Sequence, residues 1–560
     1  MNAANGEVSI VAGIENKKGY ADGDAAQALF NAPIGVAVSE NKIYVADTYN
    51  DKIRVIENGR VSTLAGGEQG FADAENGAAA KFDTPCGIAV ASDGNLIVAD
   101  AGNRRLRRVE ANGETTTVAG NGQSNSVDGL LTDAEFVEPV AVSIDKSGAI
   151  YVADGNSIRA VGRRIFPFVE TVTDRKRGFA DGNLSAARFN RPSGLAFDEN
   201  GNLFVADAEN QTVRVLSGAS VGAEITPEQI RKLRFTPEEF RSLQPARWCY
   251  NPPDARRDVA GTLGEIRGAI AEGKNAWFHN GLDIAGSYGE TARFVRAEKV
   301  LRPVAVENSG GLRELIRMPT LGYIHIRFGR DQNDKLFGDN RFQFAFGENG
   351  KIKTLRVARG ARFEAGEPIG TLNAMNHVHL IAGRAGAEMN ALDALVFPNI
   401  SDQLAPTIEK VSLFDENWRP LETENANGRI KLGGKTRVVA RAFDQMNGNA
   451  AYRKLGVYRL GYQILKEDKT PLFEPKWTIS LARLPDESAV PFVYAPGSQS
   501  GYAPQTIFDY IVTNEVHDDI VKEDFLDAAQ IEAGNYVVRV FAADFFGNQT
   551  TREINVSVQK

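Results

Sequence analysis

Histidines gather in one part of this 560-residue chain: of five in total, four lie between residues 279 and 379. His279 is followed four residues later by Asp283, His377 and His379 stand two residues apart, and His325 lies between these two motifs. Two imidazoles and one carboxylate, with a coordination position left for water, form a catalytic zinc set. Residues i and i+2 of a strand face the same side, so one histidine of the second motif can bind a metal while the other reaches a substrate. The helical His-Glu-x-x-His motif is absent, so the extra histidines must supply proton transfer.

The motifs that contain these histidines resemble the lysostaphin-type (LytM) zinc endopeptidases, which cut peptide bonds in bacterial peptidoglycan. The resemblance runs from about residue 248 to residue 383. Four motifs carry this resemblance. They are an opening strand at residues 261–267, a first metal motif at 278–284, a central Tyr-x-His strand at 322–326 and a hairpin at 366–370 before the final His-x-His. All five polar positions are filled in the order of the family, which favours an intact site over chance or a degenerate relative.

The resemblance implies a role for each of the five residues. The second histidine of His-x-His is a ligand in the family, so His279, Asp283 and His379 would hold Zn²⁺, while His325 and His377 would stay unligated and catalytic. The implied activity is hydrolysis of a peptide bond by metal-activated water, with peptidoglycan or another peptide as the substrate. The alternative is a non-catalytic cell-envelope protein that uses this domain to bind peptidoglycan or to regulate another hydrolase.

An internal repeat of about 53 residues fills the first 217 residues. The phrase Val-Ala-Asp ends at Asp47, Asp100, Asp154 and Asp207, and a Phe three residues before a Pro precedes each copy. Short alternating runs separated by Gly, Asn and Asp indicate four antiparallel strands per copy, the blade of a β-propeller. The motif resembles NHL repeats, which have an Asp-x-x-Asn turn. In the third copy Asn156 is one residue closer to the aspartate, so its turn should differ.

The two ends of the repeat region predict how the propeller closes. Residues 8–13 look like a fourth strand without its first three, and the last copy ends at residues 212–216 without a fourth strand. We therefore expect four blades, closed into a ring by pairing of these two segments. Six blades are usual for the NHL family, so four would be at the low end of the range.

Propellers of this kind more often bind a ligand than catalyse a reaction, so we expect a protein or glycan ligand here. The NHL propellers that act as metal-dependent lyases carry histidines at the ring centre, and residues 1–217 contain none. Acidic turns occur at Asp22, Asp73, Asp128 and Asp181. They are interpreted as solvated loop carboxylates, with a position near a bound cation as the alternative.

The chain is therefore expected to be mainly β and multidomain. The expected order is an NHL-type propeller at residues 1–217, a helical connector at 218–246, a lysostaphin-type zinc peptidase domain at 247–399 and an immunoglobulin-like β-sandwich at 400–560. Thr226 and Thr236, each followed by Pro and Glu, predict two helix starts in the connector. Alternating strands and glycine turns predict the sandwich, which we expect to fold alone. Its histidine, His517, is expected to be a solvated surface residue.

Composition argues against several classes of function. A net charge of −8 without a run of Lys and Arg argues against a nucleic-acid partner. No stretch approaches the roughly 20 apolar residues of a membrane span. The first residues are too short and polar for a signal peptide, yet the resemblance points to an extracellular or periplasmic protein whose signal was already removed. Cys86 and Cys249 are expected to be buried thiols, with a bridge between them as the alternative.

Overall fold

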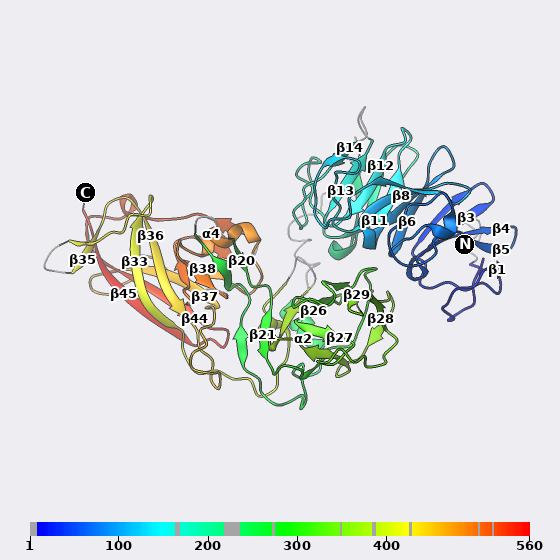
Figure 1. Ribbon diagram of the computed structural model, residues 1–560. Coiled ribbons are helices and arrows are strands. Elements are labelled where there is room, and N and C mark those ends of the chain that lie inside the picture. The colour runs from blue at the N-terminus through cyan, green and yellow to red at the C-terminus, as the bar shows by residue number, and fades with distance from the viewer. Residues whose placement is uncertain are drawn as a thin grey trace. The chain divides into compact units, whose positions relative to one another are not determined.

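The computed structural model describes residues 8–162, 168–217, 236–271, 275–347, 350–383, 388–424, 428–501, 505–517 and 520–559 (Figure 1). The chain is mainly β and divides into two compact units. The first comprises Met1–Arg234, Val300–Ala305 and Arg356–Ala361, and the second comprises Phe235–Lys299, Val306–Leu355 and Arg362–Lys560. Within the described residues, no helix has the length and apolar character needed to cross a membrane.

Each sequence repeat folds as one antiparallel sheet. The first contains β1 (Gly23–Asp24), β2 (Gly35–Ser39), β3 (Lys42–Asp47), β4 (Lys52–Glu57) and β5 (Arg60–Ala65). The second contains β6 (Pro85–Val90), β7 (Leu96–Asp100), β8 (Arg105–Val109) and β9 (Thr115–Ala119). The third contains β10 (Gly129–Leu130), β11 (Pro139–Ile144), β12 (Ile150–Asp154), β13 (Ser157–Val161) and β14 (Phe168–Thr171), and the fourth contains β15 (Pro192–Phe197), β16 (Leu203–Asp207) and β17 (Thr212–Leu216).

The turn after the Val-Ala-Asp strand differs in the third repeat, as predicted. Short 3-10 turns follow this strand in the other repeats, namely η1 (Thr48–Asn50), η3 (Ala101–Asn103) and η4 (Ala208–Asn210). In the third repeat β12 and β13 are joined through Gly155 and Asn156 alone, and Gly155 adopts a left-handed φ of 58°. The shorter Asp-to-Asn spacing therefore corresponds to a tighter turn.

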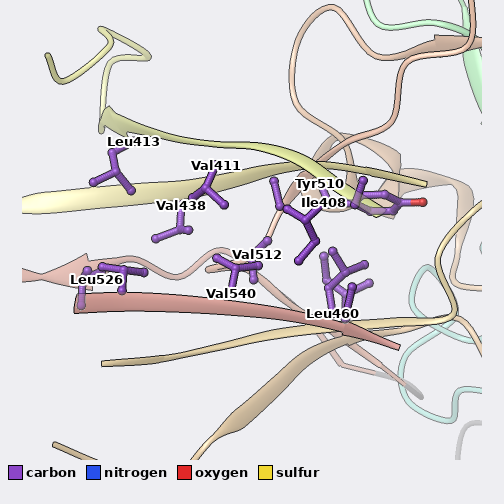
Figure 2. Close-up of a cluster of buried hydrophobic side chains, with 14 of the residues drawn as sticks. Ile408, Val411, Leu413, Val438, Leu460, Tyr510, Val512, Leu526 and Val540 are labelled. Atoms are coloured by element: carbon purple, nitrogen blue, oxygen red, sulfur yellow. The ribbon is translucent and has the colours of Figure 1, made fainter. Parts of the chain in front are cut away.

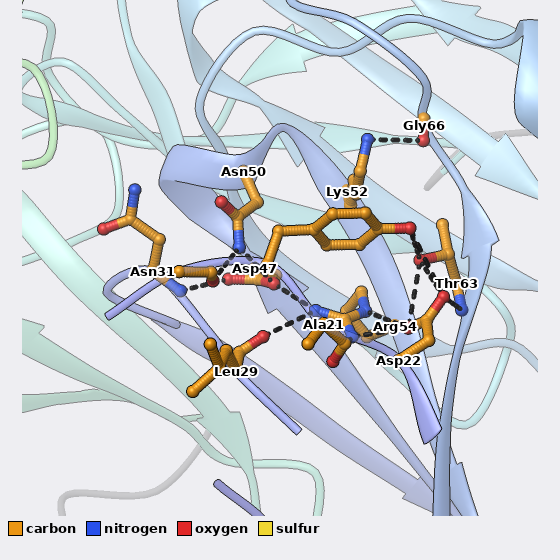
Figure 3. A network of polar contacts seen from close by, with 12 residues as sticks. Ala21, Asp22, Leu29, Asn31, Asp47, Asn50, Lys52, Arg54, Thr63 and Gly66 are labelled. Atoms are coloured by element: carbon orange, nitrogen blue, oxygen red, sulfur yellow. Dashed lines mark hydrogen bonds and ion pairs between the residues drawn. The ribbon is translucent and has the colours of Figure 1, made fainter. Parts of the chain in front are cut away.

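A buried arginine joins the parts of the first repeat (Figure 3). Arg54 donates to Asp47 Oδ2 at 2.6 Å and to Asp22 Oδ1 at 3.1 Å, and its side chain is fully buried. Asp47 Oδ1 accepts a hydrogen bond from the backbone N–H of Asn31 at 2.8 Å. Asp22 Oδ2 accepts one from the N–H of Thr63 in β5 at 3.1 Å. The Arg54 guanidinium thus links the turn that contains Asp22 to the end of β3 and, through Asp22, to β5.

The same contact recurs in the other three repeats. The pairs are Arg107 with Asp100 and Asp73, Arg159 with Asp154 and Asp128, and Arg214 with Asp207 and Asp181. The interpretation of the four acidic turns as solvated loop carboxylates is therefore corrected. Each carboxylate is partly exposed but forms an ion pair, because a buried guanidinium requires anionic acceptors close to it.

The four sheets form an open array rather than a closed ring. Their first long strands lie side by side in the order β2, β6, β11 and β15, and no comparable packing joins β15 to β2 in the described part of the chain. Residues 8–12 form no strand, with Val8 and Ile10 73% and 72% exposed. Among the described strands β17 pairs only with β16. The predicted pairing of residues 8–12 with 212–216 is therefore wrong, because four sheets packed in this way do not bring the first and last repeats together.

The predicted site residues lie on or beside a six-stranded antiparallel sheet of the second unit. Its order is β18 (Val259–Gly261), β21 (Leu282–Ala285), β32 (His377–Ala382), β26 (Leu321–Ile324), β25 (Leu315–Arg317) and β24 (Val306–Glu307). Shorter sheets accompany it: β22 (Thr291–Arg293) with β31 (Pro368–Leu372) and β27 (Ile326–Phe328), β23 (Glu298–Lys299) with β30 (Arg362–Phe363), and β28 (Phe342–Phe346) with β29 (Ile352–Val357).

Three short helices of the second unit are described: α2 (Pro237–Ser242), α3 (Ala391–Ala394) and α4 (Val490–Val493). Helix α2 begins at the predicted position, because Thr236 Oγ1 accepts from the N–H of Glu239 at 3.2 Å and the Glu239 carboxylate accepts from the N–H of Thr236 at 2.9 Å. The helix predicted to start at Thr226 lies outside the described residues. Cys86 and Cys249 are both free and buried, as expected.

Two sheets form the C-terminal part of the second unit. The smaller contains β33 (Thr407–Asp415), β36 (Lys435–Phe443), β40 (Asp509–Ile511) and β43 (Leu526–Asp527). The larger contains β34 (Thr423–Glu424), β35 (Arg429–Leu432), β45 (Gln549–Val558), β44 (Gly534–Ala543), β37 (Arg459–Lys466), β38 (Lys476–Ser480), β41 (Glu515–His517) and β42 (Ile520–Lys522). Figure 2 shows their apolar side chains facing one another, with Leu413 and Val438 on one sheet and Leu460 and Val540 on the other.

This C-terminal part shares its core with the segment that contains the histidines. Ile266 and Phe278 belong to the same hydrophobic cluster as the residues between the two sheets. Strand β19 (Ile266–Ala269) pairs with both β20 (Ala276–Phe278) and β39 (Gln499–Ser500). Tyr494 Oη also donates to the carbonyl of Gly264 at 2.8 Å. The expectation that residues 400–560 fold alone is not supported, because part of their core comes from residues before 280.

Replacing one buried arginine of the propeller repeats tests their ion-pair network. Arg107→Met should lower the free energy of unfolding of the first unit by about 3–5 kcal/mol, since Asp100 would stay buried without its partner. The neighbouring Arg108 is 35% exposed and pairs with the exposed Asp93, so Arg108→Met should cost only about 0–1 kcal/mol. Denaturant titrations of both variants measure the difference, and equal losses would contradict the assigned role of Arg107.

Removal of the C-terminal part tests the shared core. A chain that ends at Asn399 should lose solubility or unfold at a markedly lower temperature, because Ile266 and Phe278 would be exposed and the Gly264 carbonyl would lose its Tyr494 partner. Gel filtration and circular dichroism of the full and shortened chains give the readout. A soluble, folded shortened chain with unchanged metal content would restore the expectation of independent folding.

Candidate metal centre

Three of the predicted residues converge on one point. Asp283 in β21 lies directly opposite His379 in the neighbouring strand β32, and His279 follows β20. His279 Nε2 is 3.0 Å from Asp283 Oδ1 and 2.9 Å from His379 Nδ1, and His379 Nδ1 is 2.9 Å from Asp283 Oδ1. All three residues are buried. One carboxylate oxygen and two ring nitrogens thus form a compact triangle of possible metal ligands.

The hydrogen bonds of the outer ring nitrogens indicate which nitrogen of each ring carries a proton. His279 Nδ1 is 2.8 Å from the Thr262 carbonyl, which can only accept a hydrogen bond, so this nitrogen carries the proton. His379 Nε2 is 2.9 Å from Asn280 Oδ1, which accepts in the same way. In their neutral forms, both rings therefore turn a lone pair toward Asp283. Three lone pairs that meet at this distance repel one another unless a cation lies among them, so the donor set fits a zinc ion.

Electrostatics favour an ionised Asp283 and a neutral His379. Burial acts to raise the pKa of Asp283, but the rings of His279 and His379 hold it well below its ordinary value. Burial lowers the pKa of His379 to about 3, and the neighbouring His279 contributes in the same direction. At neutral pH the carboxylate is ionised and the His379 ring is neutral, as required of metal ligands.

Charged side chains next to the triangle orient the carboxylate of Asp283. Arg267 Nη2 donates to Asp283 Oδ2 at 3.0 Å, and Arg267 Nη1 donates to Glu265 Oε2 at 2.6 Å. Glu265 Oε1 accepts from the backbone N–H groups of Thr262 at 2.7 Å and Gly456 at 2.9 Å. The free oxygen of the carboxylate is therefore fixed, which leaves Oδ1 to point at the two rings. Gly456 comes from the C-terminal part, so that part supports the centre.

Two glycines permit this close packing. A Cβ at Gly281 would lie 2.7 Å from His379 Nε2, and a Cβ at Gly261 would lie 2.4 Å from Arg267 Nη2 and 2.7 Å from Asp283 Oδ2. Neither position has room for a side chain unless the centre shifts.

The other two predicted residues lie beside the triangle. The ring centroids of His325 and His377 are 4.6 Å apart, and those of His325 and His379 are 6.2 Å apart. His325 stands between β26 and β27 with a left-handed φ of 70°, and its Nδ1 is 2.7 Å from the Leu312 carbonyl. His377 Nδ1 is 2.7 Å from the Met375 carbonyl, and its Nε2 is 3.4 Å from Asp283 Oδ1. Both rings thus keep Nδ1 protonated and present Nε2.

All five residues singled out in the sequence are therefore brought together, while His517 lies apart in β41, where its Nε2 is 3.1 Å from Glu515 Oε1. Several supporting groups gave no signal in the sequence. Thr262, Leu312 and Met375 act through backbone carbonyls, which any residue type supplies. Asn280 adjoins His279 in the first metal motif, and Glu265 and Arg267 lie in the opening-strand motif at residues 261–267, so these motifs include three supporting residues.

Comparisons with known proteins concern the repeats. Residues 189–216, which include β15, β16 and β17, match the family model of the NHL repeat. Human "NHL repeat-containing protein 2" is 29% identical over 251 residues, which cover 38% of this chain and 34% of that protein. The Arabidopsis thaliana "Protein SUPPRESSOR OF QUENCHING 1, chloroplastic" is 26% identical over 280 residues, which cover 36% of this chain and 26% of that protein.

Among solved structures, virginiamycin B lyase from Staphylococcus aureus is 11% identical and aligns with 59% of this chain and 84% of its own, at a TM-score of 0.25. A score this low does not establish a common fold. The chain spans about a third or less of the length of the two curated relatives. It contains an NHL repeat, which supports the propeller prediction, and the matched repeat lies outside residues 247–399.

Proposed function

We propose that residues 247–399 form a zinc metalloendopeptidase of the lysostaphin type, which hydrolyses peptide bonds in peptidoglycan cross-links outside the cytoplasm. The observation that carries this proposal is the triangle of His279 Nε2, Asp283 Oδ1 and His379 Nδ1, whose atoms lie within 3.0 Å of one another. With His279 Nδ1 and His379 Nε2 directed at Thr262 and Asn280, the neutral rings would turn their lone pairs toward the ionised carboxylate. The substrate class rests on the resemblance of the motifs to that peptidase family.

His279, Asp283 and His379 would hold the metal, and the Thr262 carbonyl, Asn280 and Arg267 would orient them. A bound zinc ion supplies Lewis acidity and lowers the pKa of a coordinated water toward roughly 7. Thr262, Asn280 and Arg267 contact the outer atoms of the three ligands, and His325 and His377, which lie beside the triangle, would face the water and the substrate.

His325 and His377 would move the protons of the reaction. Burial lowers the pKa of His325 to about 4, so its ring is neutral at pH 7. With Nδ1–H donated to a carbonyl, each ring has an Nε2 lone pair that can accept the proton of the attacking water. The water oxygen bonds to the peptide carbon, the C–N bond breaks, and the accepted proton passes to the leaving amine nitrogen. The other ring would take a proton from solvent at Nε2, donate a hydrogen bond from it to the developing oxyanion, and return that proton to solvent when the product leaves.

A non-catalytic role in binding the cell envelope is the second candidate, and the burial of the centre favours it. His279, Asp283, His325 and His379 are all less than a tenth exposed, and the side chain of His377 is 16% exposed. Little surface of the centre is therefore open to an approaching peptide carbonyl. In either case the propeller repeats would serve to bind a protein or glycan partner.

Single substitutions separate ligands from catalytic residues. His379→Ala should abolish both zinc binding and activity, whereas His325→Ala and His377→Ala should keep zinc and lower the rate by about 10²- to 10⁴-fold. His517→Ala is the matched control and should change neither. Elemental analysis gives zinc per chain, and cleavage of a cross-linked peptide gives the rate. Loss of zinc in His377→Ala with retention in His379→Ala would reverse the ligand assignment.

Digestion of purified peptidoglycan tests the reaction itself. The zinc-loaded protein should release fragments whose masses show hydrolysis of a peptide bond in the cross-links, and a chelator should stop the release until zinc is added back. Mass spectrometry of the soluble fragments provides the measurement. If protein with one zinc per chain cuts neither peptidoglycan nor a glycine-rich peptide, the binding role replaces the peptidase.

A further inference from the structure

Three aspartates from separate segments meet at one end of the two C-terminal sheets. Asp402 precedes β33, Asp444 directly follows β36, and Asp544 directly follows β44. Each offers a carboxylate oxygen, and these oxygens lie within 4.8 Å of one another. The three residues are 7%, 6% and 1% exposed, respectively. Three carboxylates are therefore brought together in a region from which water is largely excluded.

Two of these side chains have a buried oxygen without a hydrogen-bond partner among the described residues. Asp402 Oδ1 accepts from the N–H groups of Leu404 at 3.1 Å and Asn447 at 2.9 Å, but Asp402 Oδ2 is buried without a hydrogen-bond partner. Asp444 Oδ1 is likewise buried and without a partner. A buried polar atom left unpaired costs free energy comparable to a lost hydrogen bond, and a charged one costs more. The cluster is thus incomplete as a set of protein groups.

The charges of the cluster are not balanced by the protein. Asp544 accepts from the N–H and Nδ2 of Asn548, which are neutral, and none of the ion pairs among the described residues includes Asp402, Asp444 or Asp544. Burial, followed by the charges of Asp544 and Asp402, raises the pKa of Asp444 to about 8. A divalent cation among the three carboxylates would offset their mutual repulsion and occupy the unpaired oxygens.

We propose that Asp402, Asp444 and Asp544 bind one divalent cation of the calcium type. The donors are oxygens, which suit hard cations, and no histidine or cysteine belongs to the group that would favour zinc. Ca²⁺ tolerates irregular arrangements of six to eight oxygens, whereas Mg²⁺ demands near-ideal octahedral geometry. Three carboxylates from separate segments match the first requirement better. This cation site is independent of the histidine centre in both residues and ligand chemistry.

The cation would also brace the strand beside the histidine centre. The segment that follows Asp444 includes Asn449, whose Oδ1 accepts from the N–H of Val259 at 3.2 Å and whose Nδ2 donates to the Val259 carbonyl at 2.8 Å. Val259 lies in β18, which pairs with β21, and β21 carries Asp283. A cation that fixes Asp444 therefore restrains the segment that holds the outer strand of the site sheet.

Calcium titration of the full chain tests this site. The protein is stripped with EDTA, reloaded with one equivalent of zinc to occupy the histidine centre, and titrated with CaCl₂ or MgCl₂ in a calorimeter. We expect one Ca²⁺ per chain and a rise in Tm of about 2–5 °C in 1 mM Ca²⁺. Asp444→Asn and Asp402→Asn should each weaken Ca²⁺ binding at least about tenfold and remove the rise in Tm, because each removes one of three anionic ligands.

Asp393→Asn serves as the matched control. Asp393 is half-buried in the same unit and accepts a hydrogen bond from Tyr458 at 2.7 Å, but it is not part of the cluster, so the calcium response should be unchanged. The proposal is overturned if the zinc-loaded wild type neither binds Ca²⁺ nor gains thermal stability, if it responds to Mg²⁺ alone, or if both cluster variants keep the wild-type response. None of these readouts depends on peptidase activity.

Discussion

The register between β21 and β32 decides whether the candidate metal centre exists. In an antiparallel pair, a shift by one residue would turn every side chain of one strand to the opposite face. The observed register places Asp283 opposite His379. Tyr250 holds both strands, since its Oη donates to the Ile284 carbonyl at 2.8 Å and accepts from the N–H of Val378 at 3.2 Å. This bridge joins the strands at Ile284 and Val378, one residue away from Asp283 and His379, which leaves little freedom for the carboxylate and the ring to separate.

The C-terminal part acts on the same centre through a chain of contacts. Its Gly456 N–H donates to Glu265, Glu265 pairs with Arg267, and Arg267 pairs with Asp283. The shared hydrophobic cluster holds the backbone from which these side chains project. A carboxylate ligand needs fixed outer partners to keep its metal-facing oxygen in place. The C-terminal sheets therefore belong to the structural support of the centre, whatever else they bind.

The sequence allowed prediction of features that side-chain type and spacing determine. The four repeats, the tighter third turn and the grouping of five site residues all have such patterns. Contacts that depend on how sheets pack have no such pattern in the sequence. Asp402, Asp444 and Asp544 are far apart along the chain and meet only at the end of two sheets. The prediction of ring closure failed for the same reason, because local strand patterns do not determine the angle between successive sheets. The arginine of each repeat recurs a few residues after its Val-Ala-Asp aspartate, so that signal was present in the sequence.

Because its sheets form an open array, the first unit should have the stability pattern of a linear repeat protein. Each sheet contacts its neighbours in the sequence, so the free energy of unfolding is approximately a sum of repeat terms and interface terms. Among the described strands of the repeats, the two inner sheets each pack against two other sheets and the two end sheets each pack against one. Local opening should therefore start at the ends, and amide hydrogens in β7 and β12 should exchange with solvent more slowly than those in β3 and β16. A closed ring would have no such gradient, because all of its blades would have two neighbours.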